Sequence, residues 1–191
     1  MELLDFGIYT VDKEYVRILH EADNEVYFDE YGYERKPYAG IMIFSENFNY
    51  FIPLTSAKQK HAEWNLISKD SYIIYENMPE SAIHPKWIYR NNNDGTVKHL
   101  LSVLDIKKMI PVPEGKFQKI IFSDLEDAGY GMLLMKEYRF LKPYAADILQ
   151  KAHNLYYAQK ESGKINRFFC NYVLLEEVCS EYTKSKEKAT V

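Results

Sequence analysis

The sequence contains little cysteine and no long hydrophobic segment. Only Cys170 and Cys179 occur among its 191 residues. They lie nine positions apart in a predicted helix, about 13 Å along its axis, which is too far for a disulfide. No Cys/His cluster has zinc-site spacing, and no apolar run approaches the roughly 20 residues of a membrane span. The start MELLDFGIY also lacks a signal-peptide layout. We therefore predict a soluble cytoplasmic protein with reduced thiols, no metal and no other cofactor.

Common catalytic motifs and excess positive charge are also missing. The sequence has no Gly-rich phosphate loop, Walker motif or HExxH motif, and its net charge is −4. The charge is unevenly distributed, because residues 1–34 carry −8 and the remainder +4. Residues 86–119 contain seven basic and three acidic residues. An acidic start beside a basic remainder can present a positive face to a phosphate backbone, although charge alone favours ordinary solvated lysines.

The apolar pattern that is present predicts an α+β fold in a single domain spanning 1–191. Apolar residues make up 47% and aromatic residues 15%, including 17 tyrosines that suit the rim of a core. Asp12 is the expected N-cap of a helix through about Ala22. Antiparallel strands should fill roughly the first 115 residues, and we expect them at 6–11, 38–44, 49–53, 71–75, 86–89, 97–103 and 109–112.

From Ser123 onwards the apolar spacing becomes helical. A 4-3-4-3 pattern predicts a long amphipathic helix that Pro143 should kink or divide and Gly163 should end. The pattern returns from Phe168 to Tyr182 in a final helix. Residues 120–183 are therefore the helix-rich part of the chain, and 184–191 should be a frayed tail.

The stretch Ile52 to His61, IPLTSAKQKH, follows a predicted strand and combines hydroxyl and cationic side chains. Ser56 and Gln59 fit a capping box at the start of a helix lasting to about Leu66, which is the structural interpretation. A helix N-terminus is also a natural phosphate site, because its free N–H groups carry partial positive charge.

Hydroxyls and lysines together are what a metal-independent ribonuclease needs. RNA supplies its own 2′-hydroxyl nucleophile, while the protein must move protons and hold the charged phosphorane. The candidate catalytic residues are Ser56, Thr55, Lys58 and Lys36, since antiparallel pairing of 38–44 with 49–53 would bring Lys36 towards Ser56. The general base stays open between a lysine of lowered pKa, His61 and the substrate itself.

Further residues could bind RNA without taking part in the chemistry. Cationic or aromatic side chains near the site could contact phosphates or stack on unpaired bases, and the candidates are Lys60, His61, Tyr31, Tyr33 and Tyr38. The alternative function is a non-catalytic RNA-binding or partner-binding module, which keeps the basic stretch and the tyrosines but does not cut.

Four stretches of the sequence, in this order, resemble the ToxN/AbiQ family, the ribonuclease toxins of type III toxin–antitoxin and phage abortive-infection systems. They are Ile8–Val11 followed by a helix with Tyr15, Lys36–Ile41, Pro53–Lys58 with His61, and Asn171–Glu177. Met109–Val112 also fits the family's strand before the helices. The resemblance implies a compact, strongly bent antiparallel sheet flanked by helices, similar to the MazF/Kid toxin fold.

The resemblance also implies an activity and partners. It implies a metal-independent endoribonuclease that leaves 2′,3′-cyclic phosphate and 5′-hydroxyl ends and takes part in antiviral defence. The toxin would be inhibited by a repeated pseudoknot RNA in a higher-order complex. By position, the family's active-site hydroxyls fall on Thr55 and Ser56 and its lysines on Lys36 and Lys58. The family's loop tyrosine matches Tyr31 or Tyr33, and residues 76–99 resemble an insertion.

Overall fold

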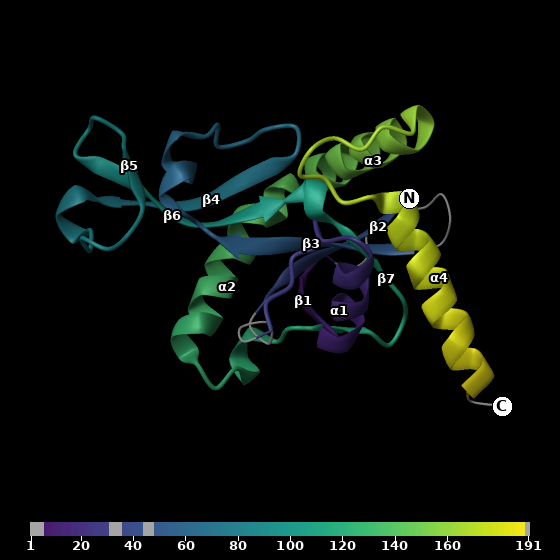
Figure 1. The fold of residues 1–191 in the computed structure, drawn as a ribbon. Coiled ribbons are helices and arrows are strands. Elements are labelled where there is room, and N and C mark those ends of the chain that lie inside the picture. Colours follow the sequence, from purple (N-terminus) through teal and green to yellow (C-terminus); the bar gives the residue numbers. More distant parts are fainter. Residues whose placement is uncertain (1–5, 31–35, 44–47, 190–191) are drawn as a thin grey trace.

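An antiparallel sheet of eight strands runs through the protein, with helices against it (Figure 1). The computed structural model describes residues 6–30, 36–43 and 48–189. The strands, in chain order, are β1 Ile8–Val11, β2 Tyr38–Ile43, β3 Phe48–Ser56, β4 Ser71–Pro79, β5 Tyr89–Asn91, β6 Thr96–Asp105, β7 Ile110–Val112 and β8 Phe117–Lys119. The α+β prediction, with an antiparallel sheet and a helical C-terminal part, is confirmed.

Strand β3 is the centre of this sheet. The order of the main strands is β4-β6-β3-β2-β1-β8, with β5 added on β6 and β7 on β3. Strands β4, β5 and β6 form an arm that extends away from the remaining strands (Figure 1). The long β3 therefore joins this arm to the part of the sheet that carries β1, β2 and β8.

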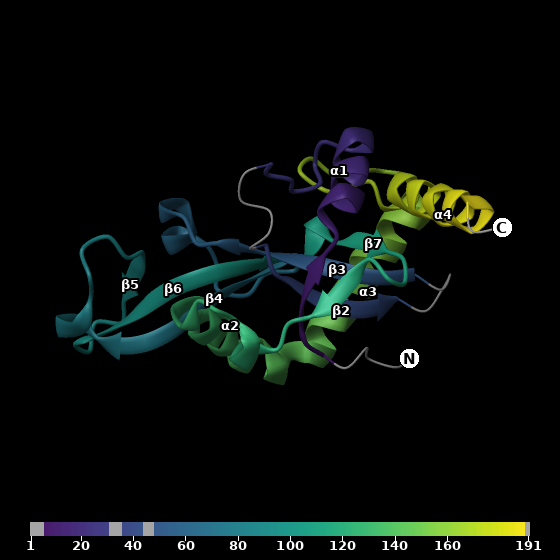
Figure 2. The same cartoon turned by 90° about the horizontal axis from the view of Figure 1, so that it is seen from below.

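Four α-helices pack around the sheet: α1 Lys13–Ala22, α2 Ala128–Leu141, α3 Ala145–Ser162 and α4 Tyr172–Ala189. Figure 2 shows α1 and α2 on opposite sides of the sheet. Helices α1 and α4 lie side by side, and the rings of Tyr15 and Tyr182 are 5.1 Å apart between centroids. No helix of the described residues has the length and apolar character needed to cross a membrane.

Short 3₁₀ helices connect several of these elements. They are η2 Gln59–Glu63, η3 Glu80–Ala82, η4 Ile106–Lys108, η5 Phe122–Asp124 and η6 Lys142–Tyr144. The segment η6 contains Pro143 and separates α2 from α3, so the predicted division of the long helix at this proline is confirmed. Gly163 ends α3 with a left-handed φ of 64°, as its position at the end of the helical pattern predicted.

Local side chains explain where two of the helices begin. Asp12 caps α1, as predicted, by accepting a hydrogen bond of 2.9 Å from the N–H of Tyr15. The last helix begins at Tyr172, later than predicted, because Phe168 has a φ of 68° that no right-handed helix contains. Asn171 Oδ1 then accepts from the N–H of Leu174 at 3.2 Å. Helix α4 continues to Ala189, past residue 184, where a frayed tail was expected.

Several strand predictions need correction, since the strand expected at 71–75 continues to Pro79 and β8 Phe117–Lys119 was not expected. The strand expected at 86–89 is wrong in its first three residues, because Lys86 and Trp87 lie in a turn closed by the Trp87 N–H on His84 O at 2.9 Å. Strand β5 begins only at Tyr89. The strand expected at 49–53 extends to Ser56, because a second neighbour, β6, pairs with the residues that follow Pro53.

Tyrosine is the main large side chain of the core. The fully buried tyrosines are Tyr15, Tyr38, Tyr50, Tyr72, Tyr156 and Tyr172. A buried hydroxyl needs a partner, and Tyr15 donates to Pro111 O at 2.8 Å while Tyr172 donates to Lys107 O at 3.2 Å. Tyr50 donates to the buried Glu176 carboxylate at 2.8 Å, which links the central strand β3 to α4.

We predict that Tyr50→Phe destabilises the fold by about 1–3 kcal/mol, because the buried Glu176 carboxylate loses a hydrogen-bond donor. Urea unfolding of the wild type and the variant measures this difference. Tyr89→Phe is the matched control, since Tyr89 is 40% exposed, and it should change the unfolding free energy very little. Equal stability of Tyr50→Phe and wild type would contradict the importance of this link.

Candidate functional site

The candidate site forms where β3 changes its neighbours. Residues Phe48–Pro53 pair with β2, whereas Leu54, Thr55 and Ser56 pair with β6. Strand β2 begins at Tyr38, opposite Pro53, and the N–H of Leu54 still donates to Pro37 O at 2.9 Å. Lys36 therefore lies two residues before β2 and beside the end of β3. The predicted antiparallel pairing of 38–44 with 49–53 had placed it there.

A cavity of about 750 Å³ opens at this point. It brings together all four predicted catalytic residues and two of the predicted RNA-binding residues. The other wall residues come from the chain after α1, from Pro37 and Leu54 beside the cluster, from Trp64 after η2, from β6 with η4, and from the loop before α4. The predicted residues in the wall are Lys36, Thr55, Ser56, Lys58, Lys60 and His61.

The predicted capping box is wrong. Ser56 is the last residue of β3 and pairs with Ser102, so the chain is still extended where a helix was expected to begin. Only the five-residue helix η2 follows, with Lys58 as its N-cap. The turn is closed by His61, whose Nδ1 accepts from the N–H of Lys58 at 2.9 Å. A phosphate at this site would therefore meet side chains at a strand end rather than the N-terminus of an α-helix.

Of the three predicted tyrosines, the structure describes only Tyr38, and it does not line this cavity. Tyr38 is 1% exposed and lies in the core, because its position in β2 turns the ring inwards. The prediction that it stacks on RNA bases is therefore wrong. Tyr31 and Tyr33 lie outside the described residues. Among the described residues, Tyr27 lines the cavity, and the sequence patterns did not single it out.

Tyr27 is held by the carboxylate of Asp105, the last residue of β6. Its hydroxyl donates to Asp105 Oδ2 at 2.9 Å, and Lys107 donates to Asp105 Oδ1 at 2.7 Å. Burial raises the pKa of Tyr27 above its ordinary value, and the negative charge of Asp105 raises it further. Tyr27 is therefore a hydrogen-bond donor here and not a general base.

Two of the cavity's lysines follow Asp105 directly. Lys108 is 5% exposed and its Nζ donates to Glu25 O at 2.8 Å and to the Glu25 carboxylate. Lys107 and Lys108 belong to the basic stretch 86–119, which by charge alone suggested solvated lysines. The signal that could have revealed them is their position immediately after a buried strand that ends in an acid.

The surroundings of Lys36 favour its neutral form. It is half-buried and its Nζ lies 4.7 Å from the centroid of the Tyr27 ring. Burial lowers the pKa of Lys36 below its ordinary value, and the nearby charge of Lys58 lowers it further, while Asp29 and Asp105 act in the opposite direction. An amine in this environment gives up its proton more easily than a solvated lysine.

His61 is buried in the wall of the cavity. Because its Nδ1 accepts the Lys58 N–H, the neutral ring carries its proton on Nε2. Burial lowers the pKa of His61, and the charges of Lys60 and Lys58 lower it further, against a smaller opposing effect of Asp105. Its ring also contacts Trp64, with centroids 4.6 Å apart.

The cavity as a whole suits an anionic ligand. Its wall contains the five lysines Lys36, Lys58, Lys60, Lys107 and Lys108 against the three acids Glu25, Asp29 and Asp105. Within the described part of the chain, no group of three or more His, Cys, Asp or Glu side chains is placed to hold a metal ion.

A family model described as Toxin ToxN, type III toxin–antitoxin system, matches residues 7–180. The chain belongs to this toxin family. It is 28% identical over 190 residues to Endoribonuclease ToxN of Bacillus thuringiensis subsp. kurstaki, covering 95% of this chain and 86% of that protein. It is 26% identical to Endoribonuclease ToxN of Pectobacterium atrosepticum, covering 94% and 95% of the two chains.

Solved structures of such toxins share the fold. One, from a type III system whose toxin is selectively inhibited by a non-coding RNA pseudoknot, has a TM-score of 0.71 at 27% identity and covers 93% of this chain and 98% of the other. The structure of AbiQ, a lactococcal anti-phage endoribonuclease, has a TM-score of 0.68 at 24% identity and covers 94% and 98% of the two chains. The predicted family resemblance is thus confirmed.

We predict that His61 makes the stability of this toxin depend on pH. Since the pKa of His61 is lowered in the folded state, the unfolded chain binds this proton first as the pH falls below about 6.5, the ordinary value for histidine. The unfolding free energy should therefore decrease below that pH, by at most about 1.4 kcal/mol per pH unit. Urea unfolding between about pH 5 and 7 measures it.

The variant His61→Gln should lack this part of the pH dependence, whereas His84→Gln, at an exposed histidine, should retain it. If wild type and His61→Gln respond identically to pH, the folded protein does not disfavour the charged form of His61.

Proposed function

We propose that this ToxN-family protein is an endoribonuclease that cleaves single-stranded RNA by attack of the ribose 2′-hydroxyl, without a metal ion. The observation that carries the proposal is the meeting of Lys36, Thr55, Ser56 and Lys58 in one cationic cavity. The names of its relatives, Endoribonuclease ToxN and Endoribonuclease AbiQ, support the same activity.

The positions of the hydroxyls and lysines suggest a role in catalysis for each side chain. Ser56 and Lys58 are exposed at the cavity rim, so an RNA phosphate meets them first, while Thr55 is half-buried behind them. Lys58 supplies positive charge to the phosphorane, and the two hydroxyls donate hydrogen bonds that position it. Such donors lower the barrier because they already point to where negative charge develops.

Lys36 is our choice for the group that takes the proton from the 2′-hydroxyl. A general base works best when its pKa lies near the working pH, and burial together with Lys58 moves the pKa of Lys36 in that direction. His61 is less suited, because Nδ1 already accepts the Lys58 N–H. A water can then supply the proton for the leaving 5′-oxygen, and the hydroxide that remains takes up the proton held by Lys36.

The same cavity explains how an RNA could control the toxin. A repeated RNA that folds into pseudoknots would inhibit it by occupying the groove that binds substrate, and each toxin would be held in an RNA-mediated complex. Inhibition by a non-coding RNA pseudoknot has been described for a structurally similar toxin. We place the protein in the cytoplasm, where its RNA targets are, with phage abortive infection as its biological role.

We predict that Ser56→Ala and Lys58→Ala each reduce RNA cleavage by at least about 100-fold, the usual effect of removing a donor to a developing anion. Expression of each variant in the absence of antitoxin RNA should also be harmless to the cell. Lys184→Ala, an exposed lysine of α4, is the control and should cleave as the wild type does. If both site variants remain as active and toxic as wild type, the site assignment is wrong. Binding of RNA by the wild type with no cleavage would instead support a non-catalytic RNA-binding module.

The role of Lys36 predicts a pH shift. Asp29 raises the pKa of Lys36, so Asp29→Asn should lower that pKa. If Lys36 is the base, the rising limb of the pH–rate profile then moves to lower pH, because the unprotonated amine is reached sooner. A falling limb that moves instead would show that Lys36 acts in its charged form.

A further inference from the structure

Phe168 is an exposed aromatic residue in an unusual backbone conformation. Its side chain is 55% exposed and its φ is 68°, in the left-handed region that bulky residues avoid. The loop that carries it is firmly attached, because the next residues contact η4: Cys170 N–H donates to Lys107 O at 3.1 Å and Tyr172 OH donates to the same oxygen at 3.2 Å. The loop thus holds an apolar ring at the surface instead of burying it.

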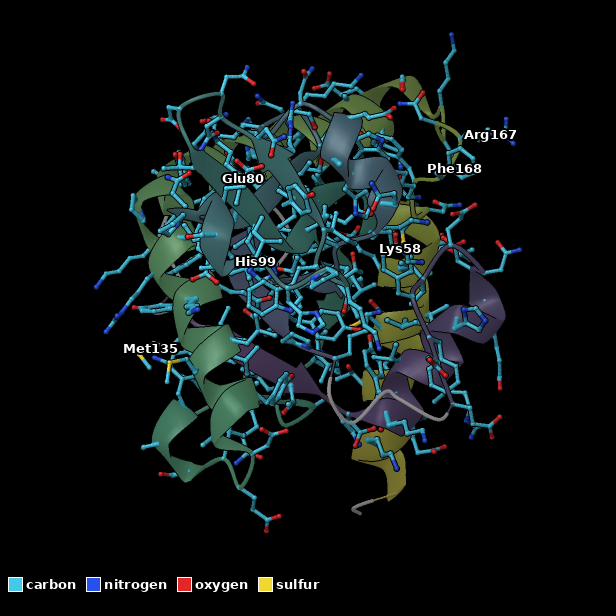
Figure 3. All side chains as sticks on the ribbon, turned by 90° about the vertical axis from the view of Figure 1, so that its left-hand side faces the viewer. Lys58, Glu80, His99, Met135, Arg167 and Phe168 are labelled. Carbon is cyan, nitrogen blue, oxygen red and sulfur yellow. The ribbon has the colours of Figure 1, made fainter. Side chains whose placement is uncertain are left out.

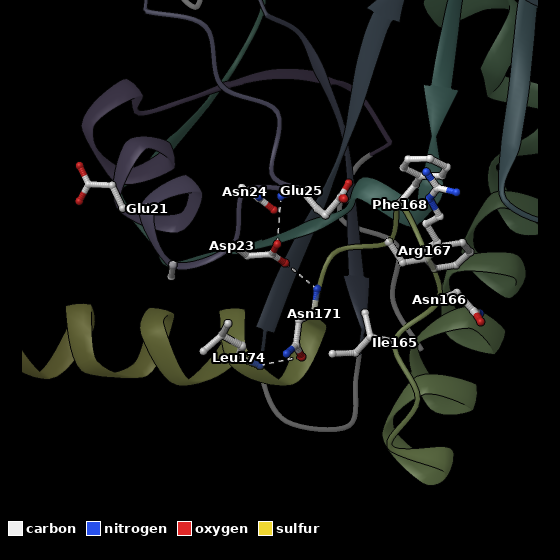
Figure 4. A pocket seen from close by; sticks show the side chains of 12 residues that line it. Glu21, Asp23, Asn24, Glu25, Ile165, Asn166, Arg167, Phe168, Asn171 and Leu174 are labelled. Carbon is white, nitrogen blue, oxygen red and sulfur yellow. Dashed lines mark hydrogen bonds between the residues drawn. The ribbon is translucent and has the colours of Figure 1, made fainter.

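The ring of Phe168 lies between the catalytic cavity and a second cavity. Phe168 and Glu25 line both of them. The second cavity has a volume of about 530 Å³ and is formed by the end of α1 and the loop between α3 and α4 (Figure 4). In Figure 3, Phe168 and Arg167 lie above Lys58 on the same side of the molecule. A strand bound at Lys58 can therefore extend directly over Phe168.

The chemistry of the second cavity fits a nucleobase better than a phosphate. Its charged wall residues are Glu21, Asp23, Glu25 and Arg167, which together are net negative and repel a phosphate. The amides of Asn24 and Asn166 also line it and can bind the polar edge of a base. Both carboxylate oxygens of Asp23 accept hydrogen bonds from the protein backbone, from the N–H of Glu25 at 3.0 Å and from the N–H of Asn171 at 2.7 Å (Figure 4). The cavity wall is therefore rigid.

The Phe168 ring is exposed and has a cation beside it, which are the features of a base-stacking surface. The guanidinium carbon of Arg167 lies 4.6 Å from the ring centroid, and the ring remains 55% exposed with this cation over it. Aromatic rings with cations beside them are the platforms on which single-stranded nucleic acids stack their bases.

A second exposed aromatic residue with lysines beside it also lines the catalytic cavity. Trp64 is 37% exposed, and the Nζ atoms of Lys60 and Lys107 lie 5.3 and 5.9 Å from its ring centroid. Trp64 and Lys107 line both the catalytic cavity and a third cavity of about 410 Å³. The second and third cavities therefore each adjoin the catalytic cavity and share an exposed aromatic residue with it.

We propose that an unpaired RNA strand crosses all three cavities and that a base next to the cleaved bond stacks on Phe168 with its edge in the second cavity. Phe168 is then a residue that determines which RNA sites are cut, and Arg167 supports the stack. This inference rests on the proposed function, because it assumes that the strand is held over Ser56 and Lys58.

The test begins with cleavage of total cellular RNA by the wild-type protein, which maps a cut site. Two short single-stranded RNAs spanning that site are then made, one with 2-aminopurine on the 5′ side of the cut bond and one with it on the 3′ side. Each is bound to the inactive Ser56→Ala protein. At one of the two positions the fluorescence should be quenched on binding. Adding Phe168→Ala should remove this quenching and weaken binding by about 5- to 150-fold, the usual effect of losing one stacked base.

Two controls make the result specific. Trp87→Ala removes a ring that is 41% exposed in the arm of β4, β5 and β6, outside the three cavities, and should change neither quenching nor affinity. Phe168→Trp keeps an aromatic surface and should restore both. Unfolding measurements should show Phe168→Ala folded, because no buried contact is lost.

The outcomes separate this inference from the proposed function. If the wild type cuts RNA but Phe168→Ala binds the probe with unchanged affinity and quenching, the stacking site is wrong while the ribonuclease assignment stands. If the wild type cuts no RNA, both are overturned.

Discussion

The structure depends on one constraint, which is that β3 must pair with different neighbours along its length. Its first residues are bonded to β2 and β7, and its last three to β6. At the change of partners β2 has not yet begun and β6 is near its end, so the segments carrying Lys36 and Asp105 meet beside Thr55 and Ser56. The sheet thus creates the cavity where β3 changes partners, with side chains from β3, from the segment before β2 and from the end of β6.

The second requirement of the site is a balance of charge. Lys36 is half-buried near Lys58, an arrangement that favours the neutral amine, while Asp29 and Asp105 favour the charged form. Asp105 also fixes Tyr27 and Lys107. In the proposed function, this balance keeps enough positive charge to attract RNA and allows Lys36 to exchange its proton. Trp64 and Phe168 also line this cavity, so in our proposal the chemistry and the binding of the strand share one groove.

The sequence predicted the parts of this structure that depend on local signals. Asp12, Pro143 and Gly163 act within a few residues, and the hydroxyl–lysine cluster after Pro53 was recognisable because its members are close in the chain. Predictions failed where a distant strand decided the outcome. Ser56 was predicted to be a helix cap, but it is a strand residue because it pairs with β6. Tyr38 was predicted to be accessible, but its position in β2 places its ring in the core. Phe168 and Asp105 reach the site only through the fold, because both are far in the sequence from the cluster after Pro53.

The central claim is that this cavity cuts RNA with the substrate's own 2′-hydroxyl and without a metal ion. The most direct measurement is mass spectrometry of the RNA fragments that the purified toxin releases in excess EDTA. The account predicts fragments with 2′,3′-cyclic phosphate and 5′-hydroxyl ends. Fragments with 3′-hydroxyl and 5′-phosphate ends, or RNA that is cut only after a divalent metal is restored, would contradict it.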